Sequence, residues 1–278
     1  MSKVVRVGLF FRSVLRRQLP ERLIQVLHAA HEARVKAFLL AAGHGTRLRP
    51  LTDRLPKCLV PIRNVPVLGI WLELCRRFGI DEVLVNLHSH KDLIEEYVSS
   101  NRSGVKVQLS HESVLLGSAG TLRANRDWVN GQPCFWVLYA DVLTTANLAR
   151  MLEFHQLRNP IATLGLYRVP DPQRCGVVKF DEAGIVREFV EKPDNPSSHW
   201  AFSGLMIGTP DLLDAIPSSQ PADLGFDVLP RLVGRMVAYP LHEYLLDVGT
   251  MENYRAAQTS WPGFLKDHEK PHVASNHL

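Results

Sequence analysis

A short apolar run that leads directly into a loop with two glycines is the feature that most constrains the fold of this chain. Residues 35–40 (VKAFLL) have the pattern of a buried strand. The loop behind this strand contains Gly43 and Gly45, and two cations follow it, Arg47 and Lys57. Because glycine lets backbone N–H groups approach an anion closely, this arrangement favours a binding site for a polyphosphate.

Two common phosphate-binding loops do not match this part of the chain. A P-loop requires Gly-x-x-x-x-Gly-Lys-Ser/Thr, a string that does not occur in the sequence. A dinucleotide-binding loop requires a third glycine, and Leu48 occupies that position, which argues against a dehydrogenase. Gly43 and Gly45 alone would equally suit a tight turn between a strand and a helix, so the interpretation depends on a longer string.

That longer string is Gly-x-Gly-Thr-Arg-Leu-x-Pro-Leu-Thr at 43–52, with Pro-Lys at 56–57. It resembles the signature of the sugar-1-phosphate nucleotidyltransferases, the enzymes that make NDP-sugars. Further blocks follow in the family's order and approximate spacing, from about residue 35 to about residue 258, and this agreement argues against chance. The blocks are 116–121 (LGSAGT), 138–141 (LYAD), 176–178 (GVV), 189–193 (FVEKP), 202–204 (FSG) and 246–250 (LDVGT).

Two strings, 151–155 (MLEFH) and 187–193 (REFVEKP), are most similar to those of mannose-1-phosphate guanylyltransferases. The resemblance implies Mg²⁺-dependent transfer of a nucleotidyl group from GTP to a mannose-like sugar 1-phosphate, giving an NDP-sugar and pyrophosphate. UTP or dTTP with a glucose-type or amino-sugar phosphate is the alternative within the family. A catalytically silent regulatory subunit is the alternative from another class, because Ala140 and Ser203 depart from the family's usual glycine and asparagine.

The composition is that of an ordinary soluble globular protein, with 278 residues, 46% hydrophobic and 22% charged. A net charge of +4 is too small to indicate a nucleic-acid binder. No apolar stretch approaches the roughly 18 residues that indicate a transmembrane helix. The four cysteines form no Cys-x-x-Cys pair, so neither a zinc site nor a redox motif is indicated, and a reducing, cytoplasmic location is expected. Oligomeric state is left open, a homodimer included.

Three regions are expected along the chain. Residues 1–34 carry seven lysines and arginines against two glutamates, and helical spacing within 20–33 predicts a basic, partly helical N-terminal extension. Such an extension would pack on the domain or on a partner subunit; a transit peptide or a membrane-surface helix is the alternative. Residues 35–262 form the predicted nucleotidyltransferase domain, and 263–278 form a polar C-terminal tail.

Strands and helices alternate from residue 35 to Pro170, which predicts an α/β fold with a Rossmann-like, mostly parallel sheet flanked by helices. Beyond Pro170, the resemblance implies a smaller mixed sugar-binding sheet beside the first, as in the nucleotide-diphospho-sugar transferase fold. The expected strands are 35–40, 82–87, 105–110, 134–139, 161–168, 176–180, 185–190, 201–208, 237–239 and 244–247. The expected helices are 67–78, 91–98, 120–127, 148–155, 211–216 and 227–234.

The implied reaction brings two polyanions together, so its site must neutralise charge and hold the reacting groups in line. Asp141 ends an apolar strand, a position that lines the ligand crevice of open α/β sheets, although alone it would equally suit a turn or a helix N-cap. The resemblance makes Asp141 and Asp247 the ligands of Mg²⁺, a hard cation that prefers oxygen. It makes Arg47 and Lys57 the residues that bind the triphosphate.

The resemblance also assigns the remaining site residues. Backbone at Gly117 and Gly120 would touch the nucleobase, Lys192 the sugar phosphate, and Glu191 the sugar hydroxyls; without the resemblance, Glu191 and Lys192 would be interpreted as solvent-facing. Asn86, at a strand end, is a further candidate. The predicted catalytic residues are Arg47, Lys57, Asp141 and Asp247; the nucleotide-binding residues are Ala41, Ala42, Gly43, Gly45, Thr46, Arg47, Lys57, Asn86, Gly117 and Gly120; the sugar-phosphate-binding residues are Gly176, Glu191, Lys192 and Ser203.

Overall fold

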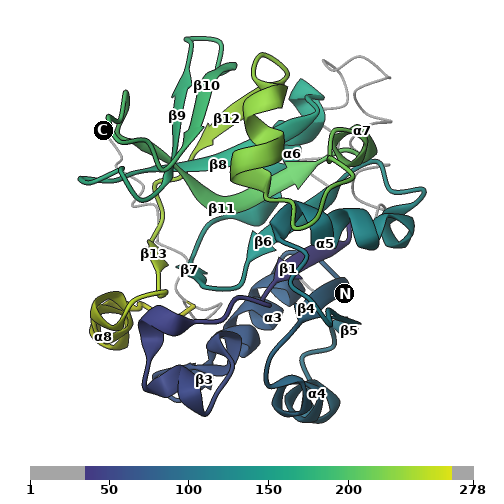
Figure 1. The fold of residues 1–278 in the computed structure, drawn as a ribbon, viewed down its shortest axis with the longest axis vertical. Helices are drawn as coiled ribbons and strands as arrows, with labels where there is room; N and C mark the ends of the chain where they lie inside the picture. Colours follow the sequence, from purple (N-terminus) through teal and green to yellow (C-terminus); the bar gives the residue numbers. More distant parts are fainter. Residues whose placement is uncertain (1–34, 265–278) are drawn as a thin grey trace, which may run out of the picture. The chain divides into compact units, whose positions relative to one another are not determined.

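A nine-stranded sheet forms the centre of the computed structural model, which describes residues 35–264 (Figure 1). The predicted extension at 1–34 and all but the first two residues of the predicted tail at 263–278 lie outside the described residues. The strands run in the order β10-β9-β11-β6-β1-β4-β5, and β8 pairs with both β11 and β12. Their bounds are β1 Ala37–Leu40, β4 Glu82–Leu87, β5 Lys106–His111, β6 Phe135–Tyr139, β8 Ala162–Arg168, β9 Gly176–Phe180, β10 Val186–Glu191, β11 Trp200–Gly208 and β12 Met236–Pro240.

The predicted α/β fold class is confirmed. Strands β5, β4, β1 and β6 form the parallel part, with β1 between β4 and β6. Strand β11 then runs antiparallel to β6 and joins β8, β9, β10 and β12 to the same sheet. Strand β8, expected within the parallel alternation, therefore lies antiparallel to β11 and parallel to β12. The mixed strands extend the first sheet through β11, and they do not form a sheet of their own.

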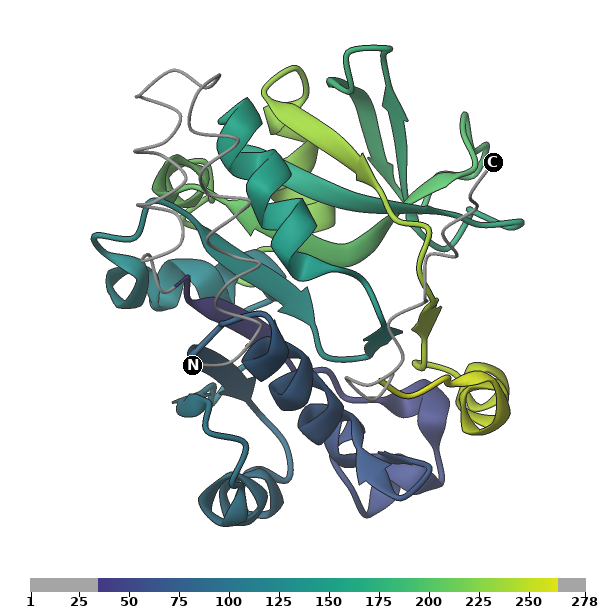
Figure 2. The same ribbon diagram turned by 180° about the vertical axis from the view of Figure 1, so that it is seen from behind.

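Helices cover both faces of the sheet. Helices α3 and α6 lie over the face seen in Figure 2, whereas α5 and α7 lie over the opposite face (Figure 1). Alternate residues of a strand point to opposite faces, so β1 gives Ala37 and Leu39 to one hydrophobic cluster and Phe38 to the other. The helices are α3 Val67–Arg77, α4 Lys91–Ser100, α5 Ser118–Ala124, α6 Leu148–Arg158, α7 Pro210–Asp214 and α8 Met251–Ser260.

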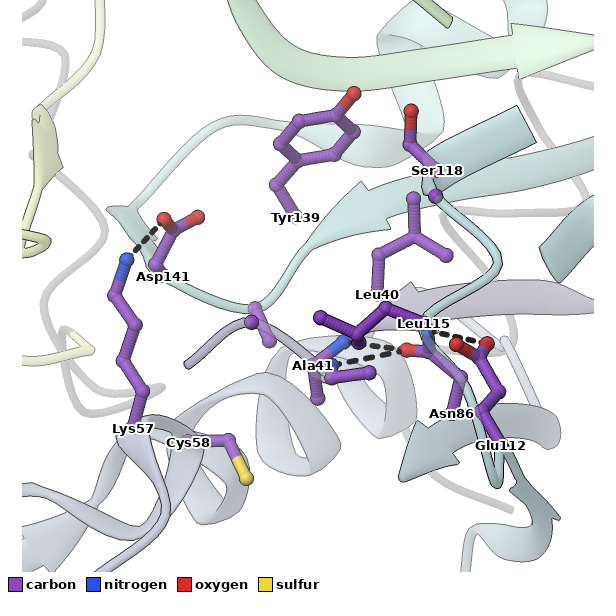
Figure 3. A pocket seen from close by; sticks show the side chains of 14 residues that line it. Leu40, Ala41, Lys57, Cys58, Asn86, Glu112, Leu115, Ser118, Tyr139 and Asp141 are labelled. Atoms are coloured by element: carbon purple, nitrogen blue, oxygen red, sulfur yellow. Dashed lines mark hydrogen bonds and ion pairs between the residues drawn. The ribbon is translucent and has the colours of Figure 1, made fainter. Parts of the chain in front are cut away.

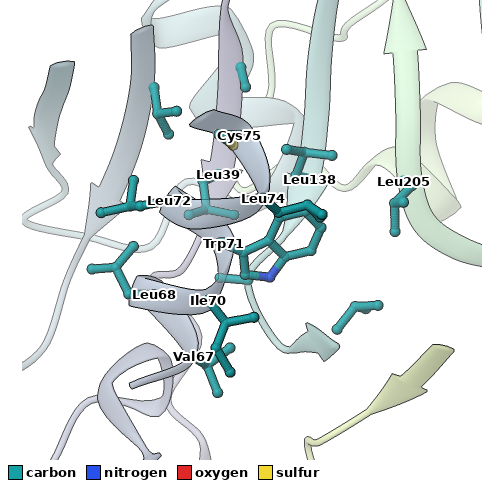
Figure 4. Close-up of a cluster of buried hydrophobic side chains, with 14 of the residues drawn as sticks. Leu39, Val67, Leu68, Ile70, Trp71, Leu72, Leu74, Cys75, Leu138 and Leu205 are labelled. Atoms are coloured by element: carbon teal, nitrogen blue, oxygen red, sulfur yellow. The ribbon is translucent and has the colours of Figure 1, made fainter. Parts of the chain in front are cut away.

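Helix α3 shows how the sequence pattern gives the packing. Its apolar residues recur at helical spacing and are all buried against the sheet, where Trp71 lies beside Leu39 of β1 and Leu138 of β6 (Figure 4). Burial of an aromatic or aliphatic side chain of this kind contributes about 1.5–3 kcal/mol relative to exposure. The predicted helix at 67–78 is thereby confirmed to within one residue.

Several short elements were not expected. Strands β2 (Pro61–Ile62) and β3 (Val65–Pro66) form a small hairpin apart from the main sheet, and β7 (Val142–Thr144) forms a second small antiparallel pair with β13 (Leu245–Asp247). Of these four strands, β13 alone was expected, as the strand at 244–247. Helix α8 was also not predicted, because Ala257 is its sole buried residue and no apolar stripe marks it. The predicted helix at 227–234 is wrong in type: a π-helical turn at Leu224–Val228 passes into a 3₁₀ turn at Leu229–Leu232.

Candidate active site

The glycine loop leaves the carboxyl end of β1 and turns sharply at Gly45. Gly45 has a φ of 64°, a left-handed conformation that side chains rarely adopt, and an added Cβ would lie 2.9 Å from Cγ2 of Thr52. The Gly45 carbonyl accepts hydrogen bonds from Leu48 N and Thr52 Oγ1, both at 2.8 Å. At Gly43, in contrast, an added Cβ would meet no atom within 4 Å. The loop is thus fixed at Gly45 and open at Gly43.

A buried polar network holds the start of this loop. Asn86 Oδ1 accepts hydrogen bonds from the backbone N–H groups of Ala41 and Ala42, at 2.7 and 3.3 Å. Asn86 Nδ2 donates to Glu112 Oε1 at 2.9 Å and to Thr121 Oγ1 at 3.0 Å. The side chain of Asn86 therefore holds the first two residues of the loop in place. Glu112 and Thr121 were not predicted as site residues. Glu112 lies outside every recognised block, and Thr121 ends the block at 116–121, in which only the two glycines were assigned a role.

A cavity of about 280 Å³ lies between the glycine loop and β6 (Figure 3). Seven of the predicted nucleotide or metal residues line it. In Figure 3, Lys57 and Asp141 meet at one side of the cavity, while Asn86 and Glu112 lie at the other, beside Leu115. The predicted residues in the lining are Ala41, Ala42, Gly43, Lys57, Asn86, Gly117 and Asp141. Gly45, Thr46, Arg47, Gly120 and Asp247 are outside this lining.

The glycine-rich turn at 116–121 packs against a distant part of the chain. Gly117 has a φ of 81°, and an added Cβ there would lie 2.3 Å from the carbonyl oxygen of Ala222. That same carbonyl accepts hydrogen bonds from Ala119 N at 3.0 Å and Gly120 N at 3.1 Å. Gly120 therefore places its N–H on Ala222, so its predicted contact with a nucleobase would have to come from elsewhere on its surface.

The two aspartates are brought together by the antiparallel pairing of β7 with β13. Asp141 directly precedes β7, and Asp247 ends β13 in register with Val142. The backbone N–H of Val248 donates to the Asp141 carbonyl at 2.8 Å, which ties the two segments directly. Residues that are 106 positions apart in the sequence thus become neighbours, as a shared metal site would require.

The two predicted cations, Lys57 and Arg47, both lie beside Gly249. Lys57 Nζ forms an ion pair with Asp141 Oδ2. An added Cβ at Gly249 would lie 2.7 Å from Asp247 Oδ1, 2.8 Å from Lys57 Nζ and 3.1 Å from Arg47 Nη2. One acidic and two basic side chains therefore converge on Gly249, and Asp141 joins them through its ion pair with Lys57.

The surroundings of Asp247 raise its pKa. Burial raises the pKa of the Asp247 carboxyl, and the negative charge of Asp141 raises it further, while Lys57, the Gly249 amide and Arg47 lower it. Two carboxylates that repel each other in a partly buried site fit a hard divalent cation, which would relieve both effects. Within residues 35–264, no group of three or more His, Cys, Asp and Glu side chains is arranged to hold a metal. Phosphate oxygens and water would have to complete the coordination of Mg²⁺.

The predicted sugar-phosphate residues divide into two places. Gly176 pairs with Glu191 across β9 and β10, and Lys192 Nζ lies 3.6 Å from Glu191 Oε1. Burial raises the pKa of the Glu191 carboxyl, and Lys192 opposes this shift. Ser203, in contrast, is buried in β11, where its hydroxyl accepts a hydrogen bond from Leu205 N at 3.2 Å. Its predicted contact with a sugar stays a prediction.

Tyr139, the last residue of β6, was not predicted and lies between these groups. It lines the cavity together with Ala140 and Asp141. Burial raises the pKa of the Tyr139 hydroxyl, and the negative charges of Asp223, Glu191 and Asp141 act in the same direction. The Tyr139 phenol thus lies near carboxylates of both the glycine-loop side and the Glu191 side. The apolar run of β6 hid this residue, because it reads as core.

The sequence matches a known protein family and several of its members. The model of the nucleotidyl transferase family matches residues 36–261. The chain belongs to that family. It is 33% identical over 227 residues to the mannose-1-phosphate guanylyltransferase catalytic subunit beta of Xenopus tropicalis, covering 79% of this chain and 62% of the relative. It is 34% identical over 238 residues to a UTP–glucose-1-phosphate uridylyltransferase of Synechocystis, covering 79% of this chain and 61% of that protein.

The fold agrees with solved structures. A UDP-glucose pyrophosphorylase in complex with UDP-glucose superposes with a TM-score of 0.71 and 22% identity, covering 82% of this chain and 98% of that one. This family member spans about three fifths of the length of the two sequence relatives described above. Among its described residues, no helix is both long and apolar enough to cross a membrane.

Proposed function

We propose that this protein transfers a nucleotidyl group from an NTP to a sugar 1-phosphate, with Mg²⁺, giving an NDP-sugar and pyrophosphate. One observation carries the proposal: Arg47, Lys57 and Asp247 converge on Gly249 beside a glycine loop, and Asp141 joins them through its ion pair with Lys57. Two carboxylates for a divalent cation and two cations for phosphates are what the meeting of two polyanions requires. Membership in the nucleotidyl transferase family supports it.

In the proposed reaction an oxygen of the sugar phosphate attacks the α-phosphorus of the NTP. The bond from the α-phosphorus to the bridging oxygen breaks, and pyrophosphate leaves with the electron pair. Arg47 and Lys57 bind the triphosphate, and Lys192 and Glu191 hold the sugar phosphate and its hydroxyls. Asp141 and Asp247 hold Mg²⁺, which when bound supplies charge neutralisation and a template for the phosphate oxygens. No side-chain nucleophile or base is needed, because the attacking oxygen is already anionic at neutral pH.

GTP and a mannose-like 1-phosphate are the substrates we favour. The strings 151–155 and 187–193 support them, as does the 33% identity to a mannose-1-phosphate guanylyltransferase subunit. UTP with glucose 1-phosphate is the second candidate, because a uridylyltransferase is similar to the chain to the same degree. The four cysteines are free, three of them buried, which supports a cytoplasmic location.

Pyrophosphate release across GTP, UTP, dTTP and ATP, each with several sugar 1-phosphates, tests the proposal. We expect turnover with one preferred pair, its loss with excess chelator, and its return with added Mg²⁺. Asp141→Asn should lower turnover roughly 100-fold or more with thermal unfolding unchanged, since a metal ligand is lost. Asp92→Asn, on the exposed first turn of α4, is the matched control and should behave as wild type. Absence of turnover with every pair would instead support a silent regulatory subunit.

A further inference from the structure

Residues 222–228, here called the bridging segment, connect the two sides of the site. At its first end, the Ala222 carbonyl accepts the N–H groups of Ala119 and Gly120, and Ala222 N donates to Leu116 O at 2.9 Å. Ser118 Oγ donates to the Asp223 carboxylate at 2.8 Å. This end of the bridging segment is therefore fixed to the turn that lines the predicted nucleotide cavity.

The other end of the bridging segment lies against the predicted sugar-phosphate residues. An added Cβ at Gly225 would lie 2.5 Å from Glu191 Oε2, so that carboxylate rests directly on the Gly225 backbone. The next residue, Phe226, has its ring centroid 5.4 Å from Lys192 Nζ. The bridging segment thus reaches Glu191 and Lys192 through two consecutive residues.

Phe226 is unusual within this segment. Its neighbours Leu224, Gly225 and Val228 are buried, whereas Phe226 is 58% exposed in a π-helical turn, a feature found often at functional sites. Core packing therefore does not account for the ring. The ring instead faces the ammonium group of Lys192, a residue with a backbone φ of 48° whose N–H donates a hydrogen bond to Cys175 O.

An aromatic ring and a carboxylate hold an ammonium group in different ways. The Glu191 carboxylate, 3.6 Å from Lys192 Nζ, attracts the ammonium but competes with any phosphate for it. The face of a ring attracts the ammonium through its quadrupole and carries no net charge, so the lysine keeps its full positive charge for an anion. A ring beside Lys192 therefore orients the side chain without neutralising it.

We propose that Phe226 is a positioning residue that aims Lys192 at the phosphate of a sugar 1-phosphate, and that the bridging segment keeps this pair in register with the nucleotide turn. This inference rests on the proposed function. It adds a residue that does not itself touch the reacting atoms and acts only through Lys192. Loss of the ring should therefore weaken the sugar phosphate selectively, while binding of the NTP is unaffected.

Steady-state kinetics of Phe226→Leu, Phe226→Trp and wild type with the preferred substrate pair test this. Loss of a partly exposed cation–π contact should raise KM for the sugar 1-phosphate about threefold in Phe226→Leu, with KM for the NTP unchanged. Phe226→Trp, which retains a ring, should restore the wild-type value. Leu157→Ala removes another exposed apolar side chain, on α6, and serves as the control with no expected change.

A double-mutant cycle identifies the route of the effect. In a Lys192→Met background, Phe226→Leu should cause no further change in KM for the sugar 1-phosphate, because its partner is already gone. Equal KM values for Phe226→Leu and wild type, equal rises for both substrates, or additive effects in the cycle would each overturn the inference while leaving the proposed function intact. A wild-type protein without turnover would contradict the proposed function, and this inference with it.

Discussion

His155, on α6, is a buried histidine whose protonation opposes folding. It is 2% exposed, its Nδ1 lies 2.8 Å from Thr163 Oγ1, and burial lowers its pKa to about 4. The unfolded chain binds this proton near pH 6.5, so stability is complete above that pH and falls as pH drops toward 4. The loss should reach about 2 kcal/mol at pH 5, measured by urea unfolding against pH 7.5. His155→Gln should flatten this dependence, whereas His111→Gln, at an exposed site, should not.

Gly249 is the residue whose missing side chain lets the charged groups converge. Its φ lies outside the left-handed region, so alanine fits the backbone, but the new Cβ would displace Asp247, Lys57 and Arg47. We expect Gly249→Ala to lower turnover about 10- to 100-fold, as small misplacements in such sites do, with thermal unfolding little changed. An added Cβ at Gly43 would meet no protein atom within 4 Å and would instead occupy space in the predicted nucleotide cavity, which Gly43 lines. Gly43→Ala should therefore raise KM for the NTP. Wild-type turnover in Gly249→Ala would contradict the convergence described here.

The sequence predicted the charged residues of the candidate site but not the residues that hold the loops around it. Asp141 and Asp247 follow apolar strands inside recognisable blocks, so a local pattern marks each of them. Glu112 and Ala222 have no such pattern, because their partners are Asn86, Gly120 and other residues distant in the sequence. Contacts of this kind arise only when the chain has folded, and one sequence contains no record of them.

At the scale of elements, Arg63 fastens helix α8 to the β2–β3 turn. Its Nε donates to the Gln258 carbonyl at 3.0 Å and its Nη2 to the Thr259 carbonyl at 2.7 Å, which satisfies carbonyls at the helix end. Arg63→Ala should lower the free energy of unfolding by about 1 kcal/mol and speed hydrogen exchange at the end of α8. Arg63→Lys keeps the charge but loses the forked guanidinium contact, so its free energy of unfolding should lie between those of wild type and Arg63→Ala. Unchanged exchange in Arg63→Ala would exclude this fastening.

Elements with strong apolar patterns were predicted well, and the others were not. Strands 82–87 and 176–180 agree with β4 and β9 residue for residue, because short runs rich in valine and leucine mark buried strands. Helix α8 buries a single alanine and therefore carries no periodic signal. The turn at Leu224–Val228 carries an apolar pattern, but its π-helical form depends on Asp223, whose carboxylate caps Gly225 N and Phe226 N.

At the scale of the whole described molecule, the sequence did not predict which strands pair with each other. Strand β11 is buried along nearly its entire length, so its sequence has the continuous apolar pattern of a parallel strand. It nevertheless runs antiparallel to β6 and to β8. The family resemblance implied two separate sheets, and the pairing of β11 with β6 joins them into one. The same pairing fixes the Glu191 side of the site to the glycine-loop side.

The continuous sheet predicts that residues 35–264 unfold as one unit. Strand β6 gives Trp136 to the first hydrophobic cluster and Phe135 to the second, so neither cluster survives without the strand that it shares with the other. Tryptophan fluorescence and far-UV circular dichroism should therefore give the same urea midpoint. Replacing Trp128 and Trp200, which pack on the second cluster, by phenylalanine leaves reporters in the first, and their midpoint should coincide with that of the circular dichroism of the same variant. Two separated transitions would show that the β6–β11 junction does not couple the two halves of the sheet.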